Sequence, residues 1–314
     1  MILTQIKRVI FLIYFVIYTL SCSKSVQLPL LKNPGSLFYN EWLNIIPYAY
    51  QKLFLSDIYQ NGSFITTNKV DIVICNHINR IDSLIFSSVI KNNTSKNMYP
   101  VIQKELVKIP VIGAFSKGCI VLERNYELDK NNITNALKKI NNGLIVIFPE
   151  GTRMNEDNFK KSQKYCEKNN FKKYNNLLYP KMKGMDLIVN ELYKQDKLGN
   201  VIDLTLKVKD KFKFKTGYFD YLNNVGNLYC NVNSYKINEN TINDYELFKK
   251  WFLMIWDKKE SYLDNYIDFE YKRLDYTMKT STFVLNLVFF NLIIFYIKTF
   301  TNFSLFKKNN IIIN

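Results

Sequence analysis

The sequence predicts an α/β fold, with a mixed, largely parallel sheet flanked by helices and apolar membrane helices at the N- and C-termini. Two observations lead to this prediction. Between residues 64 and 210, short apolar runs typical of buried strands alternate with segments of helical periodicity. Near the two ends of the chain, at 9–20 and 283–306, lie extended apolar stretches with basic residues beside them.

Composition narrows the class of protein. The 314 residues are 47% hydrophobic and 15% aromatic, with only 10 glycines and 7 prolines, which argues against collagen-like and linker-rich chains and leaves one large domain or two small ones. A formal charge of +16 favours an anionic partner: nucleic acid, a membrane surface or a phosphorylated substrate. The five cysteines are scattered without a CxxC pair, so we expect reduced thiols, no disulfides and no metal site.

The N-terminal run 9–20 leaves three interpretations open. It follows Lys7 and Arg8 and precedes small residues at 21–23, as a secretory signal would. It fits equally well a retained anchor or a helix half-immersed in one leaflet, because it is short for a span. Residues 36–62 are rich in aromatics and poor in charges, and they predict a helix that leads into the globular part, with a membrane-leaning helix as the alternative.

The alternating region predicts six strands and three helices. The strands are predicted at 70–75, 98–103, 118–122, 144–148, 176–179 and 201–208, and the helices at 81–91, 126–141 and 184–195. Ligand sites in such domains lie at the carboxyl ends of strands.

The first candidate site lies in the stretch 70–82. Its apolar run predicts a strand, and after a turn the apolar residues fall at helical spacing. His77 therefore lies at a strand-to-helix junction, with Asp82 in the first turn of the helix. His77 is the only histidine of the chain. Five residues of continuous helix would turn Asp82 about 140° away from His77, so the two meet only if His77 lies on the loop. A carboxylate that contacts one ring nitrogen leaves the other nitrogen free to accept a proton, as in a general base. The plain alternative is a histidine that only caps the turn.

Two stretches are rich in lysine. Residues 158–183 contain eight lysines and one acid, and from 207 to 215 every second residue is lysine. In a strand, the second pattern would place all of its lysines on one face. A solvated surface is the plain interpretation, and contact with anionic lipid headgroups is the functional alternative.

The C-terminal region predicts a transmembrane segment. Residues 283–297 carry no charge, and the run continues to Phe306 before the basic pair at 307–308. Its length is close to that needed to span a bilayer, and it is apolar all round, which favours a span over a buried core helix.

Three further polar blocks lie at predicted strand ends. The hexapeptide 148–153, Phe-Pro-Glu-Gly-Thr-Arg, combines a glycine that permits close backbone approach with a hydroxyl and a planar guanidinium suited to phosphate. The block 104–124 ends with Arg124 just after a strand. The third block is 178–184, Leu-Tyr-Pro-Lys-Met-Lys-Gly.

These motifs, in their order and separations, resemble those of the glycerolipid acyltransferases of the 1-acylglycerol-3-phosphate acyltransferase type. The matching features are Asn76-His77-x4-Asp82, the block from Gly118 to Arg124, the hexapeptide 148–153 and Pro180. The segments 180–184, 201–205 and 256–260 resemble the eukaryotic membrane branch, which includes lysophosphatidic acid, lysophosphatidylinositol and lysocardiolipin acyltransferases. The resemblance covers about residues 40–270.

The resemblance implies a mechanism and a set of site residues. His77 would deprotonate the acceptor hydroxyl, which attacks the thioester of acyl-CoA, and Asp82 would orient the histidine; neither an acyl-enzyme nor a cofactor beyond acyl-CoA as co-substrate is implied. The residues implied in binding the acceptor phosphate are Arg124, Glu150, Gly151, Thr152 and Arg153, and Lys104 and Gly118 match less invariant positions. Pro180 and Lys181 form the fourth motif, where lysine replaces the arginine common in relatives and lacks its bidentate fork.

The leading hypothesis is a membrane-bound enzyme that converts lysophosphatidic acid to phosphatidic acid at the endoplasmic reticulum or another intracellular membrane. The alternatives are acylation of lysocardiolipin or lysophosphatidylinositol, or a non-catalytic basic membrane protein. The basic stretches accompany apolar runs and no nucleic-acid motif is present, so we expect membrane lipids and no nucleic acid as partners. The predicted domains are an anchor or signal-like segment at 1–35, an acyltransferase domain at 36–275, and a transmembrane segment and tail at 276–314.

Overall fold

The structure, a computed structural model, describes most of the predicted acyltransferase domain. The described residues are 5–13, 15–16, 34–78, 82–108, 113, 118–123, 125–208 and 226–275. Arg124 and the segment 276–314, with its predicted membrane run, lie outside them.

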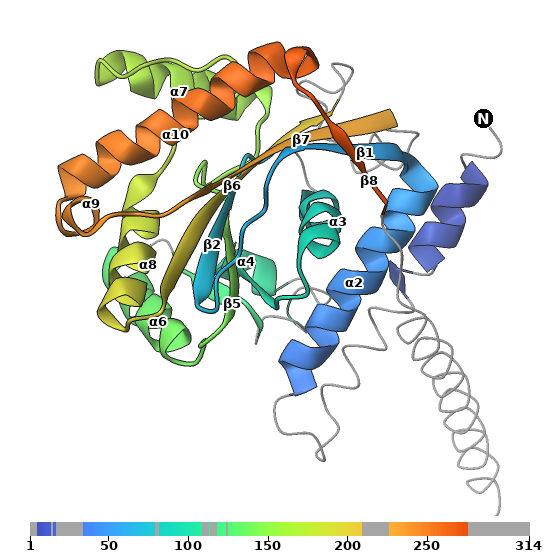
Figure 1. Cartoon of the computed structure of the whole chain (residues 1–314), viewed down its shortest axis with the longest axis horizontal. Helices are drawn as coiled ribbons and strands as arrows, with labels where there is room; N and C mark the ends of the chain where they lie inside the picture. The colour runs from blue at the N-terminus through green and yellow to red at the C-terminus, as the bar shows by residue number, and fades with distance from the viewer. Residues whose placement is uncertain are drawn as a thin grey trace, which may run out of the picture.

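Eight strands form one mixed sheet in the order β4-β3-β5-β2-β6-β7-β1-β8 (Figure 1). The strands are β1 (Leu55–Gly62), β2 (Val70–Cys75), β3 (Met98–Gln103), β4 (Ile120–Leu122), β5 (Gly143–Ile147), β6 (Leu198–Val208), β7 (Gly226–Tyr235) and β8 (Lys272–Leu274). β2 is parallel to its neighbours β5 and β6, and β3 and β4 extend the parallel half. β7 is antiparallel to β6 and parallel to β1, and β8 is antiparallel to β1 at the edge. His77 therefore follows a central parallel strand.

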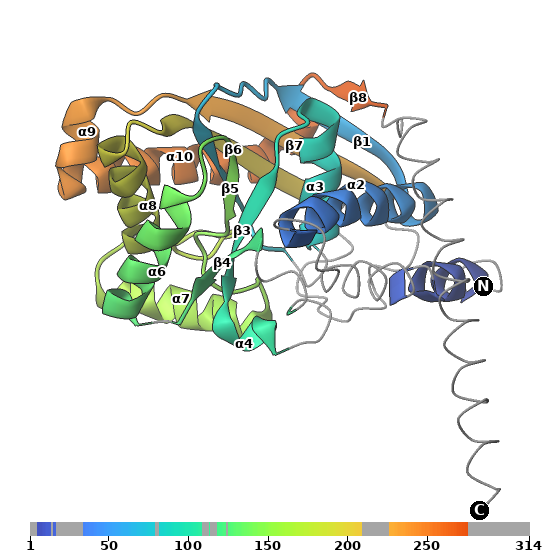
Figure 2. The ribbon, with the colours of Figure 1, turned by 90° about the horizontal axis from the view of Figure 1, so that it is seen from below.

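Helices cover both faces of the sheet (Figures 1 and 2). α2 (Pro34–Phe54) and α3 (Asp82–Asn93) cover one face, and α6 (Tyr126–Lys138), α8 (Met182–Lys194) and α10 (Tyr245–Asn265) cover the other. The remaining described elements are α4 (Lys104–Val107), α7 (Glu156–Lys168), α9 (Glu239–Asn243) and the 3-10 turn η4 (Tyr266–Asp268).

The central strand β2 is buried along its whole length because both of its faces are covered. Val73 and Cys75 belong to the core under α2 and α3, whereas Ile72 and Ile74 belong to the core under α8 and α10. Alternate side chains of a strand point to opposite faces, so a strand between two helical layers needs a continuous apolar run rather than an alternating one.

Most of the predicted elements of the alternating region are confirmed, and two predictions are wrong. The strands at 70–75 and 98–103 and those near 118–122, 144–148 and 201–208 are present, as are helices close to 81–91, 126–141 and 184–195. Residues 176–179 are instead a loop, whose Leu177 and Leu178 are buried although they pair with no strand. The helix predicted over 36–62 ends at Phe54, because the chain there turns into β1 to pair with the distant β7.

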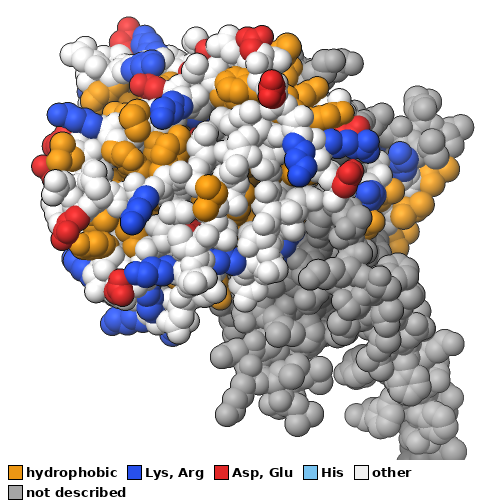
Figure 3. Space-filling model, in the orientation of Figure 1, with side chains coloured by type: hydrophobic (Ala, Val, Ile, Leu, Met, Phe, Trp, Pro, Cys, Tyr) orange, Lys and Arg blue, Asp and Glu red, His pale blue; other side chains and the backbone are white. Residues whose placement is uncertain are grey.

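The lysine-rich stretch 158–183 lies in α7, the loop after it and the start of α8. All eight of its lysines are exposed. Three of them pair with acidic side chains, in the pairs Lys160–Glu156, Lys172–Asp257 and Lys173–Glu167. On the face seen in Figure 3, basic side chains are spread between apolar and acidic ones. Most of the stretch 207–215 lies outside the described residues.

The structure describes part of the predicted N-terminal membrane segment, 9–20, and none of the C-terminal one, 283–306. No helix within the described residues combines the length and apolarity needed to cross a membrane. The run 283–306 lies outside the described residues, so its spanning role stays a prediction. The described part of 9–20 is helical, and its Phe11 packs against Tyr50 and Phe54 of α2.

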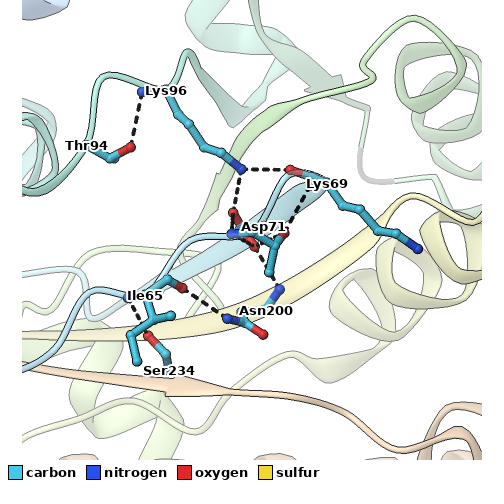
Figure 4. A network of polar contacts seen from close by, with 8 residues as sticks. Ile65, Lys69, Asp71, Thr94, Lys96, Asn200 and Ser234 are labelled. Atoms are coloured by element: carbon cyan, nitrogen blue, oxygen red, sulfur yellow. Dashed lines mark hydrogen bonds and ion pairs between the residues drawn. The ribbon is translucent and has the colours of Figure 1, made fainter.

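At the end of β2 opposite to His77, the buried Asp71 joins the segments that enter the sheet (Figure 4). Its carboxylate accepts the backbone N–H groups of Thr67 at 3.1 Å and Asn200 at 2.8 Å, and it pairs with Lys96 Nζ at 2.7 Å. One buried carboxylate thereby ties together the starts of β2 and β6 and the segment that leads into β3.

A second buried ion pair joins α10 to β6. Lys259 and Asp203 have side-chain exposures of 0% and 1%, and their charged groups are in contact. Lys259 Nζ also donates to Leu204 O at 3.0 Å and to Thr205 Oγ1 at 2.9 Å. Burial raises the pKa of Asp203, and Lys259 opposes that rise. Each charge therefore depends on the other for its compensation in the core.

We predict that breaking this ion pair from one side destabilises the fold more than removing it altogether. Lys259→Met or Asp203→Leu alone should each cost about 3–5 kcal/mol of unfolding free energy, because one charge stays buried without its partner. The double variant should recover a large part of that loss. Urea unfolding of the three variants measures this, and a double variant with the summed loss of the two single ones would contradict it.

Candidate active site

His77 lies in the loop after β2, and its ring contacts the first residue of α3. Nδ1 is 2.8 Å from Oδ2 of Asp82. The Asp82 side chain is 1% exposed and that of His77 is 22% exposed. A carboxylate only accepts, so Nδ1 carries the proton and Nε2 is the basic nitrogen of the ring. This is the geometry of a general base with an orienting carboxylate.

Aromatic rings hold the imidazole in this orientation. Phe148, which follows β5, stacks on the His77 ring with 4.4 Å between centroids and 29° between planes. Phe86 of α3 meets Phe148 edge-on at 5.5 Å. The preceding Asn76 exchanges two hydrogen bonds with the backbone of Leu206, at 2.8 and 2.9 Å, which fixes the end of β2 to β6.

Glu150 joins two loops through one buried carboxyl group. Oε1 accepts the backbone N–H of His77 at 2.8 Å, and Oε2 accepts that of Leu178 at 3.1 Å. The residue is 2% exposed. Burial raises the pKa of Glu150 to about 8, although the two N–H donors act in the opposite direction. Glu150 thus holds the backbone of His77 in place, and its predicted role in binding the acceptor phosphate stays a prediction.

The hexapeptide turns sharply after β5. Gly151 N–H donates to Phe148 O at 3.0 Å, and Gly151 has φ +67°, a left-handed conformation that glycine adopts without strain. A Cβ at this position would lie 2.9 Å from Cδ of Lys181 and 3.2 Å from its Nζ. Lys181 N–H donates to Pro149 O at 2.7 Å. The glycine therefore makes room for the Lys181 side chain, which brings an ammonium group over the turn.

The end of the hexapeptide runs alongside His77. Met154 N–H donates to His77 O at 2.8 Å, so both backbone polar groups of His77 are held by the segment 150–154. Thr152 and Arg153 lie in the chain between these two contacts. The structure thus brings the His77–Asp82 pair and the Gly-Thr-Arg turn together, although the sequence separates them by some 70 residues.

Three other predicted site residues lie around this centre. Lys104, the first residue of α4, pairs with Glu123 at 2.9 Å after β4. Gly118 is buried just before β4, and Pro180 is buried beside Lys181. Arg124, which follows Glu123, lies outside the described residues, so its role stays a prediction.

Two polar residues that the sequence analysis missed hold the hexapeptide turn. Gln103, at the end of β3, donates from Nε2 to Gly151 O at 3.1 Å. Asn158, in the first turn of α7, donates from Nδ2 to Thr152 Oγ1 at 3.0 Å and to Arg153 O at 2.9 Å. No local pattern marks these two residues, because their importance comes from contacts made only in the folded chain.

The four described cysteines are free thiols, at positions 75, 119, 166 and 230. Burial raises the pKa values of Cys75, Cys166 and Cys230, so these thiols are poor nucleophiles. Within the described ranges, no group of three or more His, Cys, Asp or Glu side chains is placed to hold a metal ion.

Comparison with known proteins places these motifs in a family. Residues 58–226, more than half of the chain, match the family described as Acyltransferase. The chain belongs to this acyltransferase family. The matched range contains the His77–Asp82 pair, the hexapeptide and Pro180, as the sequence motifs led us to expect.

The names of curated relatives of this acyltransferase specify different acceptors. It is 28% identical to the probable 1-acyl-sn-glycerol-3-phosphate acyltransferase 5 of Arabidopsis thaliana, over 56% of the chain and 48% of the relative. It is 23% identical to lysocardiolipin acyltransferase 1 of Gallus gallus, over 72% of the chain and 62% of the relative. The chain thus spans between about half and three fifths of the length of these two relatives.

A solved structure shares the fold. The 1-acyl-sn-glycerophosphate (LPA) acyltransferase PlsC of Thermotoga maritima superimposes with a TM-score of 0.53, covering 83% of this chain and 96% of that one, at 16% identity. The likeness supports the α/β architecture with its mixed sheet, and it leaves the acceptor of this acyltransferase undefined.

The buried carboxyl of Glu150 predicts a stability that falls as the pH rises. Its pKa is about 8 in the folded chain and near 4.5 when exposed, so between these values the folded state holds more protons than the unfolded state. Stability contributed by the neutral group is therefore lost as the pH rises toward 8. Glu150→Gln keeps the shape without the titration, so the unfolding free energy of the natural chain should fall relative to that of Glu150→Gln from pH 5 to pH 8.

Urea unfolding of both chains at several pH values measures this difference. Because other titrating groups are shared, the subtraction isolates residue 150. A difference that stays constant, or that grows in favour of the natural chain as the pH rises, would show that Glu150 is ionised throughout.

Proposed function

We propose that this acyltransferase moves an acyl chain from acyl-CoA to the free hydroxyl of lysophosphatidic acid, giving phosphatidic acid, with His77 as general base and Asp82 as its orienting carboxylate. The observation that carries the proposal is the 2.8 Å contact between Nδ1 of His77 and Asp82, made beside the turn that holds Thr152 and Arg153. A base and a set of phosphate-binding groups side by side suit an acceptor that has both a hydroxyl and a phosphate.

In the proposed reaction, the acceptor provides the nucleophile. Nε2 of His77 accepts the proton of the acceptor hydroxyl as its oxygen attacks the thioester carbonyl carbon. The C–S bond breaks, and the departing thiolate takes the proton back from the imidazolium, so the products are the ester and free CoA. Asp82 stabilises the imidazolium between these two transfers. No protein side chain is acylated, in keeping with the buried state of Cys75, two residues before His77.

The acceptor phosphate is proposed to lie over the hexapeptide turn. Arg153 offers a planar guanidinium, Thr152 a hydroxyl, and Lys181 an ammonium group above Gly151. Glu150 in the same turn does not oppose the phosphate, because its pKa of about 8 keeps it largely neutral at pH 7. The second-motif residue Arg124 is proposed to complete this set.

Another lysophospholipid acceptor is the second candidate. The relative named lysocardiolipin acyltransferase 1 aligns with 72% of the chain, a larger share than the plant relative does. A relative named 2-acyl-1-lysophosphatidylinositol acyltransferase, from Saccharomyces cerevisiae, aligns with 62%. An assay of labelled acyl-CoA against lysophosphatidic acid, lysocardiolipin and lysophosphatidylinositol separates these candidates by the ratio of their kcat/KM values.

We also infer that the enzyme works at a membrane, on membrane lipids. The described N-terminal helical residues bury Phe11 against α2. They also expose six apolar side chains, at Ile6, Val9, Ile10, Leu12, Ile13 and Val16. Apolar exposure of this kind suits the acyl region of a bilayer better than water. The run 283–306 would add a span, and the endoplasmic reticulum or another intracellular membrane is the proposed location.

The catalytic assignment predicts that His77 cannot be replaced. General base catalysis contributes about 10²–10⁴-fold, and the chain contains no second imidazole. His77→Ala should therefore lose acyl transfer by at least that factor, and Asp82→Asn should also lose it steeply, because the neutral amide cannot stabilise the imidazolium. Steady-state assays with labelled acyl-CoA measure the loss, and acid-quenched samples should carry no acylated protein.

Two control measurements show whether these variants still fold and reach the membrane: the unfolding midpoint, and the fraction of the protein recovered with membranes. Both should stay close to the values of the natural chain. Near-normal turnover by folded His77→Ala would overturn the mechanism. A natural chain that acylates no lysophospholipid of the panel would favour the non-catalytic alternative instead.

The phosphate assignment predicts a selective defect for Arg153→Ala. Losing a charge-assisted hydrogen bond should raise the KM for lysophosphatidic acid about 10- to 100-fold, with a much smaller change in the KM for acyl-CoA. Varying each substrate at a saturating level of the other measures both constants. Equal changes in the two constants would mean that Arg153 has a structural role or contacts the CoA.

A further inference from the structure

Asn158 stands out among the polar residues near the site because its amide contacts two parts of the hexapeptide at once. It lies in the first turn of α7, and its own N–H is capped by Asn155 Oδ1 at 2.7 Å. Its Nδ2 donates to Arg153 O at 2.9 Å and to Thr152 Oγ1 at 3.0 Å. Both hydrogens of the amide nitrogen are thus used on the turn that the proposed function assigns to phosphate.

The orientation of this amide follows from its partners. Arg153 O is a backbone carbonyl and can only accept, so the group that faces it must be the Asn158 nitrogen. The same nitrogen then presents its second hydrogen to the Thr152 hydroxyl. A hydroxyl that accepts a hydrogen bond on one side keeps its own proton for a partner on another side. Within the described residues, Asn158 is the hydrogen-bond partner of the Thr152 side chain.

We propose that Asn158 is a specificity-determining positioning residue, which makes the Thr152 hydroxyl a donor directed at the phosphate of the acceptor. The inference rests on the proposed function and adds a residue that acts through Thr152 without touching the substrate. A dianionic phosphate presents only acceptor oxygens, and a hydrogen bond from a hydroxyl to a charged oxygen is stronger than one to the neutral oxygen of a hydroxyl or amide. A hydroxyl held as a donor therefore favours phosphate over these neutral groups. Thr152 lies in the chain between Glu150 and Met154, the two residues that hold the backbone of His77.

The choice of asparagine at this position has a physical reason. The residue lies three positions after the N-cap Asn155, where the helix dipole favours an acid, and Glu156 and Asp157 before it are acidic. Aspartate would suit the helix equally well, but it cannot donate to Arg153 O and would accept the Thr152 proton. An amide therefore serves the polarity of the turn rather than the stability of α7.

The test is the isosteric substitution Asn158→Asp. It should turn the Thr152 hydroxyl toward residue 158, so that the hydroxyl no longer donates to the phosphate. Both the KM and the calorimetric Kd for lysophosphatidic acid should then rise about 10- to 100-fold, the range expected for loss of a hydrogen bond to a charged group. The KM for acyl-CoA should change little. Thr152→Val should give a similar loss, and Asn158→Asp should add less than about threefold in the Thr152→Val background, because both act through one hydroxyl.

The matched control is Asn155→Asp, which adds the same charge to the same helical turn and keeps the cap, without contacting Thr152. Its constants should stay within about threefold of those of the natural chain. Equal constants for Asn158→Asp and Asn155→Asp would overturn the proposal, as would a defect confined to acyl-CoA or an undiminished effect in the Thr152→Val background.

The calorimetric arm separates this inference from the proposed function. It measures binding of lysophosphatidic acid in detergent without turnover. Weaker binding by Asn158→Asp in a chain that transfers no acyl group would support the phosphate site and reject the catalytic proposal. Normal transfer to lysophosphatidic acid with unchanged binding by Asn158→Asp would support the catalytic proposal and reject the role of Asn158.

Discussion

The active-site region depends on the pair of hydrogen bonds made by the Glu150 carboxyl group. One oxygen holds the backbone of His77 after β2, and the other holds Leu178 in the loop before α8, while Glu150 itself follows β5. Three segments distant in sequence are thereby fixed to one buried group. A buried carboxyl without donors is costly, so any displacement of one segment leaves a polar atom unpaired and is resisted.

The site is built from both helical layers. Asp82, which contacts the His77 ring, begins α3 on one face of the sheet, whereas the loop that carries Lys181 is held from α10 on the other face. Glu260 of α10 accepts the backbone N–H groups of Asn175 and Asn176 at 2.5 and 3.0 Å. The His77–Asp82 pair and the turn proposed to hold phosphate therefore keep their relative positions only while both layers are packed on the sheet.

The sequence predicted those parts of the fold that short-range patterns encode. The run 70–75 had to be a strand covered on both faces, and the spacing of His77 and Asp82 allowed contact only from a loop. β1 and β7 were missed because their pairing is non-local and their sequences are rich in Asn, Gln and Ser. The buried loop at Leu177 and Leu178 was mistaken for a strand, since an apolar run records burial and not conformation. Gln103 and Asn158 could not be found, because only tertiary contacts bring them to the hexapeptide.

Trp256 gives the site an optical probe. The chain has three tryptophans, and this one is fully buried, with its indole N–H bonded to Leu178 O at 3.0 Å. Three hydrogen bonds in succession, through Leu178 and Glu150, lead from the indole to the backbone of His77. Indole emission responds to the polarity and hydrogen bonding around the ring. A chain with phenylalanine in place of Trp42 and Trp251 would therefore carry a single tryptophan, through whose emission movements of the loop proposed to bind substrate become measurable without a label.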